Sequence, residues 1–295
     1  MTEKTIYALG FFDGVHLGHQ ALLTECKRLA AENGCKTGAL TFRSSPAAVL
    51  TGQKENAITT LHDRATLLKH SGMDTVQVFD TDRETLSITW QDFLRILTED
   101  GAAGFVCGAD FRFGQGGAGD AACLQAFCRE KNLPCAVVAE QQMDGQKISS
   151  TRIRALLEQG DVTQANRLLG HPYVLTGQVV KGRQLGRTIE FPTANLALPE
   201  ELLCPKLGVY ACKAIIDGQE YMAVTNIGTR PTVSGEGVTI EAHLLDFYKD
   251  LYGKVLTLQF HAFLRPEKKF NSLEALQAEI QKNVQQTRNF FQKSE

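Results

Sequence analysis

The chain has 295 residues, a net charge of −2 and a 43% hydrophobic composition, which excludes a wholly disordered protein and favours two domains. Residues 1–170 carry 17 basic and 20 acidic side chains and residues 171–295 carry 14 and 13, so neither part has the basic excess of a nucleic-acid binder. No apolar run is long enough to span a bilayer, and no apolar signal segment precedes the first predicted strand. We therefore expect a cytoplasmic protein without nucleic-acid or membrane partners.

Short apolar segments alternate with segments of helical periodicity in the first half of the chain. This alternation predicts a doubly wound parallel sheet with helices on both faces. Ligands of such sheets bind at the carboxyl ends of the strands. The predicted strands are 6–9, 37–42, 75–79, 104–107 and 136–138, and the predicted helices include 61–70, 90–97 and 121–131.

A segment rich in glycine and histidine, residues 10–20, lies between the first strand and the following helix. Unpaired backbone N–H groups and the positive end of the helix dipole favour an anion at such a turn. Gly14 and Gly18 allow close approach of the backbone, and His16 and His19 can both donate hydrogen bonds to one oxyanion. The alternative is a tight turn with two surface histidines.

Two later segments are expected at the same edge of the sheet. Residues 108–114 contain two phenylalanines that could enclose a planar ring and an arginine that could bind phosphate, although a flexible surface loop is the alternative. Residues 148–157 read as a capped helix whose first turn carries three hydroxyls and two arginines, which suggests a second anion site.

The second half changes to short alternating strands after a helical connection at 160–170. Strands without intervening helices predict a small antiparallel barrel, closed here by an amphipathic helix at 273–291. A basic, glycine-spaced loop at 181–187 is typical of a solvated hairpin, but Thr193 and Asn195 beyond it could bind magnesium or phosphate. The predicted strands are 175–180, 208–216, 221–225, 239–246 and 254–263.

Taken together, several motifs resemble one family, the bacterial bifunctional riboflavin kinase/FAD synthetases, across nearly the whole chain. The motifs follow one another in the order expected for two domains, and such an ordered set would not arise by chance. They are GFFDGVHLGHQ (10–20), GADFRFG (108–114), ISSTRIR (148–154), GRQLGRTIEFPTAN (182–195), TNIGTRPT (225–232), IEAHLLDF (240–247) and LYGK (251–254).

The resemblance implies an FMN adenylyltransferase domain of nucleotidylyltransferase type at 1–158, a connector at 159–172 and a riboflavin kinase domain at 173–295. In the kinase domain, riboflavin and ATP with Mg²⁺ would give FMN, with Glu241 as general base on the ribityl hydroxyl. Thr193 and Asn195 would bind the metal and the phosphates. The remaining ATP-binding positions implied for the kinase are Lys181, Gly182, Gly186 and Arg187.

In the first domain the resemblance implies attack of FMN on the α-phosphate of ATP, giving FAD and pyrophosphate. His16 and His19 would stabilise the charge that develops on the transferred group. The implied ATP-binding residues are Phe11, Asp13, Gly14, His16, Gly18 and His19, with Ser150, Thr151 and Arg154 holding pyrophosphate, and the implied flavin-nucleotide loop is Asp110, Phe111, Arg112 and Phe113.

The sequence departs from the family pattern at a few positions. Ser44 and Ser45 stand where the family has proline and histidine, beside the predicted adenylylation site. Glu190 replaces a glycine before the PTAN segment, and His171 replaces an arginine at the domain junction. Two alternatives therefore accompany the bifunctional enzyme: a riboflavin kinase with an impaired first domain, and a flavin-binding regulator without catalytic activity.

Overall fold

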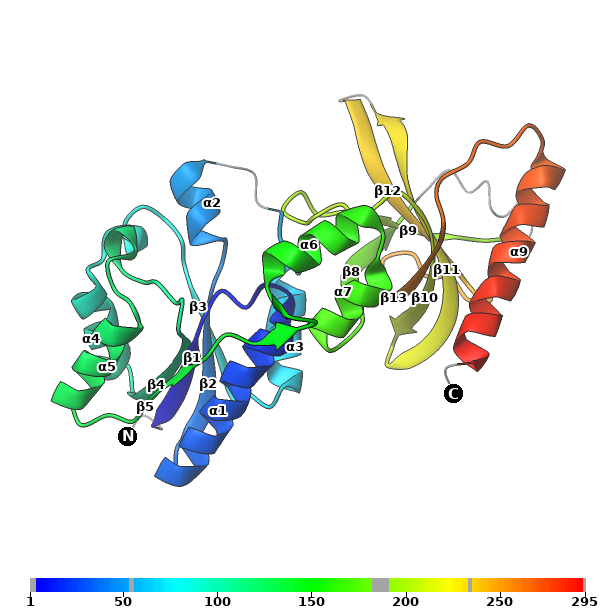
Figure 1. Ribbon diagram of the computed structural model, residues 1–295. Coiled ribbons are helices and arrows are strands. Elements are labelled where there is room, and N and C mark those ends of the chain that lie inside the picture. The colour runs from blue at the N-terminus through cyan, green and yellow to red at the C-terminus, as the bar shows by residue number, and fades with distance from the viewer. Residues whose placement is uncertain (1–3, 53–55, 182–190, 233–234, 294–295) are drawn as a thin grey trace. The chain divides into compact units, whose positions relative to one another are not determined.

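The computed structural model describes residues 4–52, 56–181, 191–232 and 235–293 (Figure 1). The chain divides into two compact units. The first comprises Met1–Ala57 with Leu61–Ser150, and the second comprises Ile58–Thr60 with Thr151–Glu295. Within the described ranges, no helix has the length and apolar character needed to cross a membrane.

The first unit contains the predicted parallel sheet, with five strands in the order β3-β2-β1-β4-β5. The order reverses between β1 and β4, so the segment that follows β1 lies at the topological switch point, where such sheets bind ligands. Because both faces are covered, β1 and β4 are almost continuously apolar and buried. The strands are β1 (Thr5–Leu9), β2 (Lys36–Phe42), β3 (Thr75–Phe79), β4 (Ala102–Gly108) and β5 (Cys135–Val138).

Helices cover both faces of this sheet (Figure 1). On one face, α1 and α3 bury apolar residues such as Leu23 and Leu68 against Ile6 of β1. On the other face, α4 and α5 contribute Phe93 and Leu124 to a second core. The helices are α1 (Leu17–Asn33), α2 (Pro46–Thr51), α3 (Leu61–His70), α4 (Trp90–Glu99) and α5 (Ala121–Glu130), with 3-10 turns η1 (Asp13–Val15), η2 (Thr85–Ser87) and η3 (Gln115–Gly117) and a short hairpin of β6 (Gln142–Met143) and β7 (Gln146–Lys147).

The second unit contains the predicted antiparallel barrel, which closes in the order β10-β11-β12-β9-β8-β13. Two short helices, α6 (Ser150–Gln159) and α7 (Val162–Leu169), precede it. The terminal helix α9 (Leu273–Gln292) packs Val284 and Ile280 against Val209 and Val224 of the barrel wall. The strands are β8 (Tyr173–Val180), β9 (Ala194–Ala197), β10 (Gly208–Ile216), β11 (Gln219–Thr232), β12 (Gly235–Leu244) and β13 (Val255–Arg265).

The register of the barrel separates an apolar row from a polar row. Ile227, Ile240 and Leu196 lie directly opposite one another on β11, β12 and β9 and are buried. Because side chains alternate along a strand, the next pairing places Asn226, Glu241 and Asn195 together on the opposite face, where all three are half-buried. The fold of the barrel therefore brings a polar row together from three strands.

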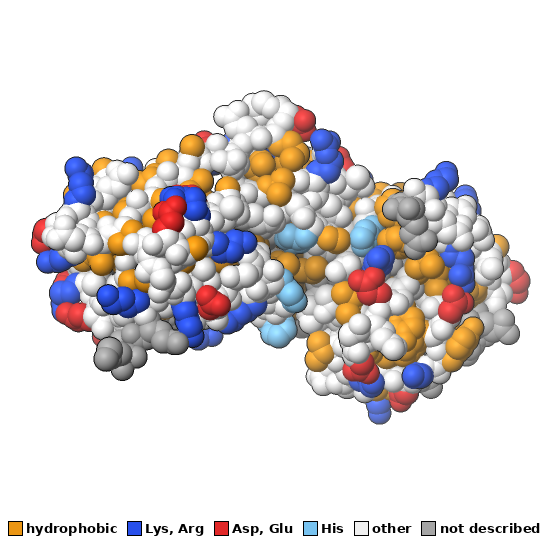
Figure 2. Space-filling model, turned by 90° about the horizontal axis from the view of Figure 1, so that it is seen from below, with side chains coloured by type: hydrophobic (Ala, Val, Ile, Leu, Met, Phe, Trp, Pro, Cys, Tyr) orange, Lys and Arg blue, Asp and Glu red, His pale blue; other side chains and the backbone are white. Residues whose placement is uncertain are grey.

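The charged side chains of the surface are mixed in sign. On the face shown in Figure 2, basic and acidic groups are interspersed over each unit. Some form local pairs on one helix, as Arg28 does with Glu25 and Glu32. Such exposed pairs contribute only about 0–1 kcal/mol each to stability, so the core and the register define the fold.

Candidate active sites

The loop after β1 adopts a strained backbone. Phe12 has φ 57° and Val15 has φ 40°, both in the left-handed region that residues with a side chain rarely adopt. Gly14 has φ 77°, where only glycine is free of strain. Left-handed non-glycine residues cost about 1–2 kcal/mol each and persist where surrounding contacts hold them. Such strain is concentrated at ligand-binding sites, which agrees with the position of this loop at the switch point.

Hydrogen bonds from distant elements hold this loop in place. The Thr41 hydroxyl of β2 donates to the Phe11 carbonyl at 2.8 Å, and the Ser150 hydroxyl donates to the Asp13 carbonyl at 3.0 Å. The side-chain amide of Gln20 donates to the Val15 carbonyl at 3.0 Å. Alternate carbonyls of the loop are therefore bonded to three different segments of the first unit. Ser150, which is predicted for the pyrophosphate site, lies directly against the loop.

The two histidines of the loop stack on each other. The rings of His16 and His19 lie 3.6 Å apart between centroids and 11° from parallel. The backbone N–H of His19 donates to Nδ1 of His16 at 3.2 Å, so Nδ1 is the acceptor and Nε2 is the ring nitrogen that carries a proton. A Cβ at Gly18 would lie 3.1 Å from the His16 ring, so glycine gives that ring its space.

Burial and neighbouring positive charge keep His19 neutral. Burial, then His16, then Arg64 hold the pKa of His19 well below its usual value. Its Nδ1 atom is buried without a hydrogen-bond partner among the described residues. An unsatisfied buried polar atom costs about 1–3 kcal/mol and marks a place where a ligand can complete the site.

The other residues predicted for ATP in the first domain have mixed environments. Phe11 is half-buried, whereas the Asp13 carboxyl is buried in η1. Thr151 and Arg154 follow Ser150 in α6, where Thr151 is exposed and Arg154 is half-buried. Both are grouped with the second unit, whereas Ser150 is grouped with the first.

The predicted flavin-nucleotide loop follows β4. Phe111 and Phe113 stack at 5.5 Å and 16°, but Phe113 is buried in the core with Phe93, which leaves Phe111 as the half-buried ring of the pair. The exposed Asp110 pairs with Lys147 at 2.6 Å. Arg112 is also exposed and lies 3.5 Å from Asp120. Both ion pairs are exposed, and the loop presents one aromatic ring at its surface.

Ser44 and Ser45 take local structural roles. The Ser45 hydroxyl accepts a hydrogen bond from the Ala48 N–H and caps α2, with Pro46 at the first helical position. The Ser44 N–H donates to the Thr81 hydroxyl at 3.2 Å. Sequence analysis did not predict α2, which is short and buries none of its residues.

In the second unit, Glu241 and Asn195 are directly paired between β12 and β9. Directly opposite residues of an antiparallel pair have Cβ atoms about 4.5–5.5 Å apart, so the carboxylate and the amide share one place on the barrel. The Asn195 amide nitrogen donates to the Thr193 carbonyl, which orients the amide oxygen as the group that can meet a cation. The predicted base is therefore brought next to the predicted metal-binding residues.

A cavity of about 450 Å³ adjoins Asn195. Thr193 and Asn195 line it, and Lys249 and Asp250 from the loop after β12 add charged groups that sequence analysis did not single out. Glu241 is not among its lining residues. Lys181 is exposed beyond the end of β8, while Gly182, Gly186, Arg187 and Glu190 lie outside the described residues.

Comparison with known proteins gives the family. Residues 1–152 match the family model of FAD synthetase, and residues 169–291 match that of riboflavin kinase. A curated bifunctional riboflavin kinase/FMN adenylyltransferase from Listeria monocytogenes is 37% identical over 294 residues, covering 98% of this chain and 93% of that protein. The chain belongs to the bifunctional riboflavin kinase/FMN adenylyltransferase family. The family member of the same name from Bacillus subtilis is 36% identical with the same coverage.

A solved structure with the same overall fold carries a different description. It is a crystal structure described as a macrolide-efflux protein from Streptococcus pneumoniae, with 30% identity, a TM-score of 0.87 and coverage of 98% of this chain and 95% of that one. Both family models and the curated relatives agree on the flavin enzyme family for this chain. The family confirms the predicted combination of a nucleotidylyltransferase domain with a riboflavin kinase barrel.

Proposed function

We propose that this chain makes flavin cofactors in two consecutive steps, phosphorylating riboflavin to FMN and adenylylating FMN to FAD. Membership of the bifunctional family supports both activities. The observation that carries the assignment to particular residues is that each domain assembles its own predicted chemistry. Ser150 meets the histidine loop in the first unit, and Glu241 pairs with Asn195 in the second.

In the kinase step, Glu241 accepts the proton of the terminal ribityl hydroxyl as that oxygen attacks the γ-phosphate of ATP. FMN and ADP are the products, so the phosphoryl group and the proton are both accounted for. Because Glu241 is half-buried, its carboxylate is accessible to the substrate without being fully desolvated. The residues proposed to bind the ATP phosphates are Lys181, Gly182, Gly186 and Arg187.

The residues at the kinase cavity fit a magnesium ion. Mg²⁺ prefers oxygen ligands and is usually held by few protein groups together with substrate phosphates. Thr193 supplies a hydroxyl and Asn195 an oriented amide oxygen at the cavity wall, which suits that preference. Thr193 and Asn195 would hold the ion, which when bound would neutralise charge on the transferring phosphoryl group.

In the adenylylation step, the FMN phosphate attacks the α-phosphate of ATP, and pyrophosphate leaves. His16 and His19 lie at the carboxyl edge of the sheet, where their N–H groups stabilise the developing charge. Phe11, Asp13, Gly14 and Gly18 shape the loop around ATP. Ser150, Thr151 and Arg154 bind the departing pyrophosphate, and Asp110, Phe111, Arg112 and Phe113 border the flavin nucleotide.

The domain limits and the location belong to the same proposal. We place the adenylyltransferase at 1–158, a connector at 159–172 and the kinase at 173–295. Both reactions consume ATP, which supports a cytoplasmic enzyme. Its partners are then the small molecules riboflavin, FMN and ATP.

A chromatographic time course with riboflavin, ATP and Mg²⁺, and a parallel one started from FMN, tests the proposal. Glu241→Gln should lower FMN formation by about 10²-fold to 10⁴-fold and spare FAD formation from FMN. His19→Ala should lower FAD formation by about 10²-fold while FMN accumulates. Glu220→Gln and His62→Ala, both at exposed positions, are the matched controls.

The same assays separate the alternatives. FMN without FAD from either substrate would support a riboflavin kinase with an impaired first domain. No product from either substrate would refute both enzymatic assignments and favour a flavin-binding regulator. Wild-type rates for Glu241→Gln would remove the general-base assignment while leaving the kinase activity in place.

A further inference from the structure

Arg64 is a buried charge in the first unit that the predicted site does not include. It belongs to α3 and is only 1% exposed. Arginine is almost never fully buried unless its guanidinium is paired, because removing a charge from water is costly. The contacts that compensate this cost therefore indicate which parts of the first unit the Arg64 side chain holds together.

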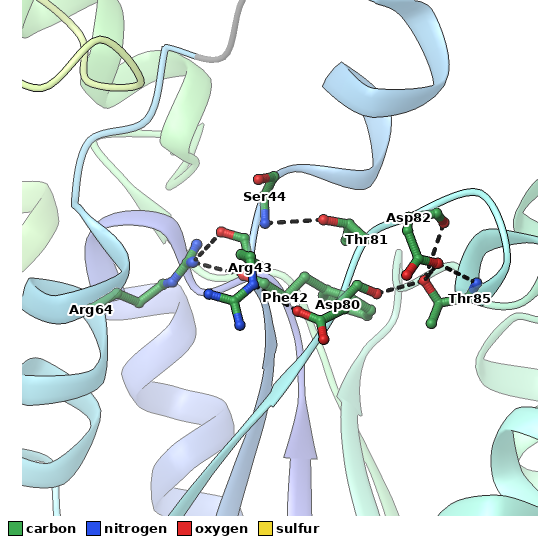
Figure 3. Close-up of polar contacts among 8 residues, drawn as sticks. All are labelled: Phe42, Arg43, Ser44, Arg64, Asp80, Thr81, Asp82 and Thr85. Carbon is green, nitrogen blue, oxygen red and sulfur yellow. Dashed lines mark hydrogen bonds and ion pairs between the residues drawn. The ribbon is translucent and has the colours of Figure 1, made fainter.

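The guanidinium of Arg64 contacts the carboxyl end of β2 (Figure 3). Its Nη2 donates to the carbonyl oxygen of Phe42 at 2.7 Å and approaches that of Arg43 at 3.3 Å. Phe42 is the last residue of β2, and the N–H of Arg43 donates onward to the Phe79 carbonyl at the end of β3. Arg64 is thus fastened to the point where β2 leaves the sheet.

The same guanidinium packs over the loop after β1. Its central carbon lies 4.3 Å from the centroid of the Phe11 ring, a cation–π geometry. Phe11 precedes the left-handed Phe12, whose ring packs edge-on against His19 at 5.2 Å. One side chain therefore connects the end of β2 with the loop that carries both histidines.

We propose that Arg64 is a positioning residue for adenylyl transfer, fixing the spacing between the loop after β1 and the end of β2 so that His19 keeps its place. This inference rests on the proposed adenylyltransferase activity of the first domain. A planar guanidinium can donate to carbonyls and stack on a ring at once, which a lysine ammonium cannot do in the same geometry. A displacement of about 1 Å at a catalytic group can lower the rate by about 10²-fold.

Arg64 also acts on His19 through its charge. It is one of the groups that hold the pKa of His19 low, after burial and the stacked His16. The elements packed around the loop also carry two buried carboxyls, Asp13 on η1 and Asp63 on α3. Because arginine stays protonated at all relevant pH values, its charge on the site is constant and favours a bound polyphosphate.

The test compares Arg64→Met, Arg64→Lys and the control Arg28→Met, an exposed arginine of α1, in the full-length chain. FAD formation from FMN and ATP is followed against pH, and the riboflavin kinase rate of each preparation serves as an internal standard. Arg64→Met should lower kcat for FAD formation at least about tenfold. It should also move the acid limb of kcat/KM to higher pH, because the pKa of His19 rises when the nearby positive charge is removed.

Arg64→Lys should restore the acid limb to its wild-type position but recover only part of the rate. A wild-type rate and acid limb for Arg64→Met, per folded molecule, would overturn the inference while leaving adenylyl transfer intact. If Arg64→Met does not fold, the test rests on Arg64→Lys. A wild-type kcat of Arg64→Lys would show that a guanidinium is not needed at this position and would overturn the inference. A wild-type chain that makes no FAD would overturn the proposed activity and this inference with it.

Discussion

The hydroxyl of Thr41 offers a direct test of how the histidine loop is held. Thr41 is completely buried in β2 and donates to the Phe11 carbonyl at 2.8 Å. Thr41→Val removes this donor and keeps the shape of the side chain, so no cavity confuses the result. The loss of a buried hydrogen bond that leaves its partner unsatisfied costs about 1–3 kcal/mol.

That cost is comparable with the strain stored in the loop. Two left-handed residues, Phe12 and Val15, together cost about 2–4 kcal/mol, which contacts such as the Thr41 hydrogen bond must offset. For a unit of this size, a loss of 1 kcal/mol lowers the unfolding temperature by about 2–4 °C. We therefore expect the transition of the first unit to fall by about 2–12 °C and the loop to populate relaxed conformations that bind ATP poorly.

Calorimetry of the full chain measures the unfolding, and chromatography measures FAD formation from FMN and ATP. We expect a higher KM for ATP in FAD formation and an unchanged riboflavin kinase rate. Thr66→Val, at an exposed position of α3, is the control. If Thr41→Val unfolds at the wild-type temperature and makes FAD with wild-type kinetics, the Thr41 hydroxyl does not hold the loop.

Two further predictions concern the same unit. His19 has a lowered pKa in the folded protein, so below about pH 6.5 its side chain binds a proton in the unfolded chain but not in the native one. The free energy of unfolding should therefore fall with decreasing pH by up to about 1.4 kcal/mol per pH unit. His19→Asn should flatten this slope in a series of thermal melts at different pH values. Ser45→Ala removes the cap of α2 and should cost about 1 kcal/mol of local stability. Amide hydrogen exchange at residues 46–51 should then become faster, and a wild-type exchange rate there would contradict the capping role.

Much of the fold could be predicted because long elements carry their own periodicity. Helix 61–70 and strands 75–79 and 208–216 have the bounds that the apolar pattern predicts. Strand β9 was missed because four residues are too few to show a period, and the segment becomes a strand by pairing with β8 and β12. Helix α2 was missed because it buries nothing and is defined by its serine cap and a terminal glycine alone.

The candidate sites divide in the same way. The histidine loop and the PTAN segment are each contiguous, so the order of the residues alone marks them as candidate sites. Thr41 and Arg64 act on the loop from 30 and more residues away, and no local pattern marks them. An arginine in an amphipathic helix is ordinarily expected on its solvent-facing side. This one is buried by tertiary contacts with the end of β2 and with Phe11.

The role of the Ser44–Ser45 segment follows from these contacts. Ser45 caps α2, Ser44 is bonded to Thr81, and Arg64 holds the two carbonyls just before them, so the segment is fastened without a histidine. The groups that we propose to stabilise charge in the first unit are His16 and His19, which stack on each other in the strained loop after β1. The departure from the family pattern therefore changes the border of the site and leaves its stacked histidine pair in place, which favours a working adenylyltransferase over a kinase alone.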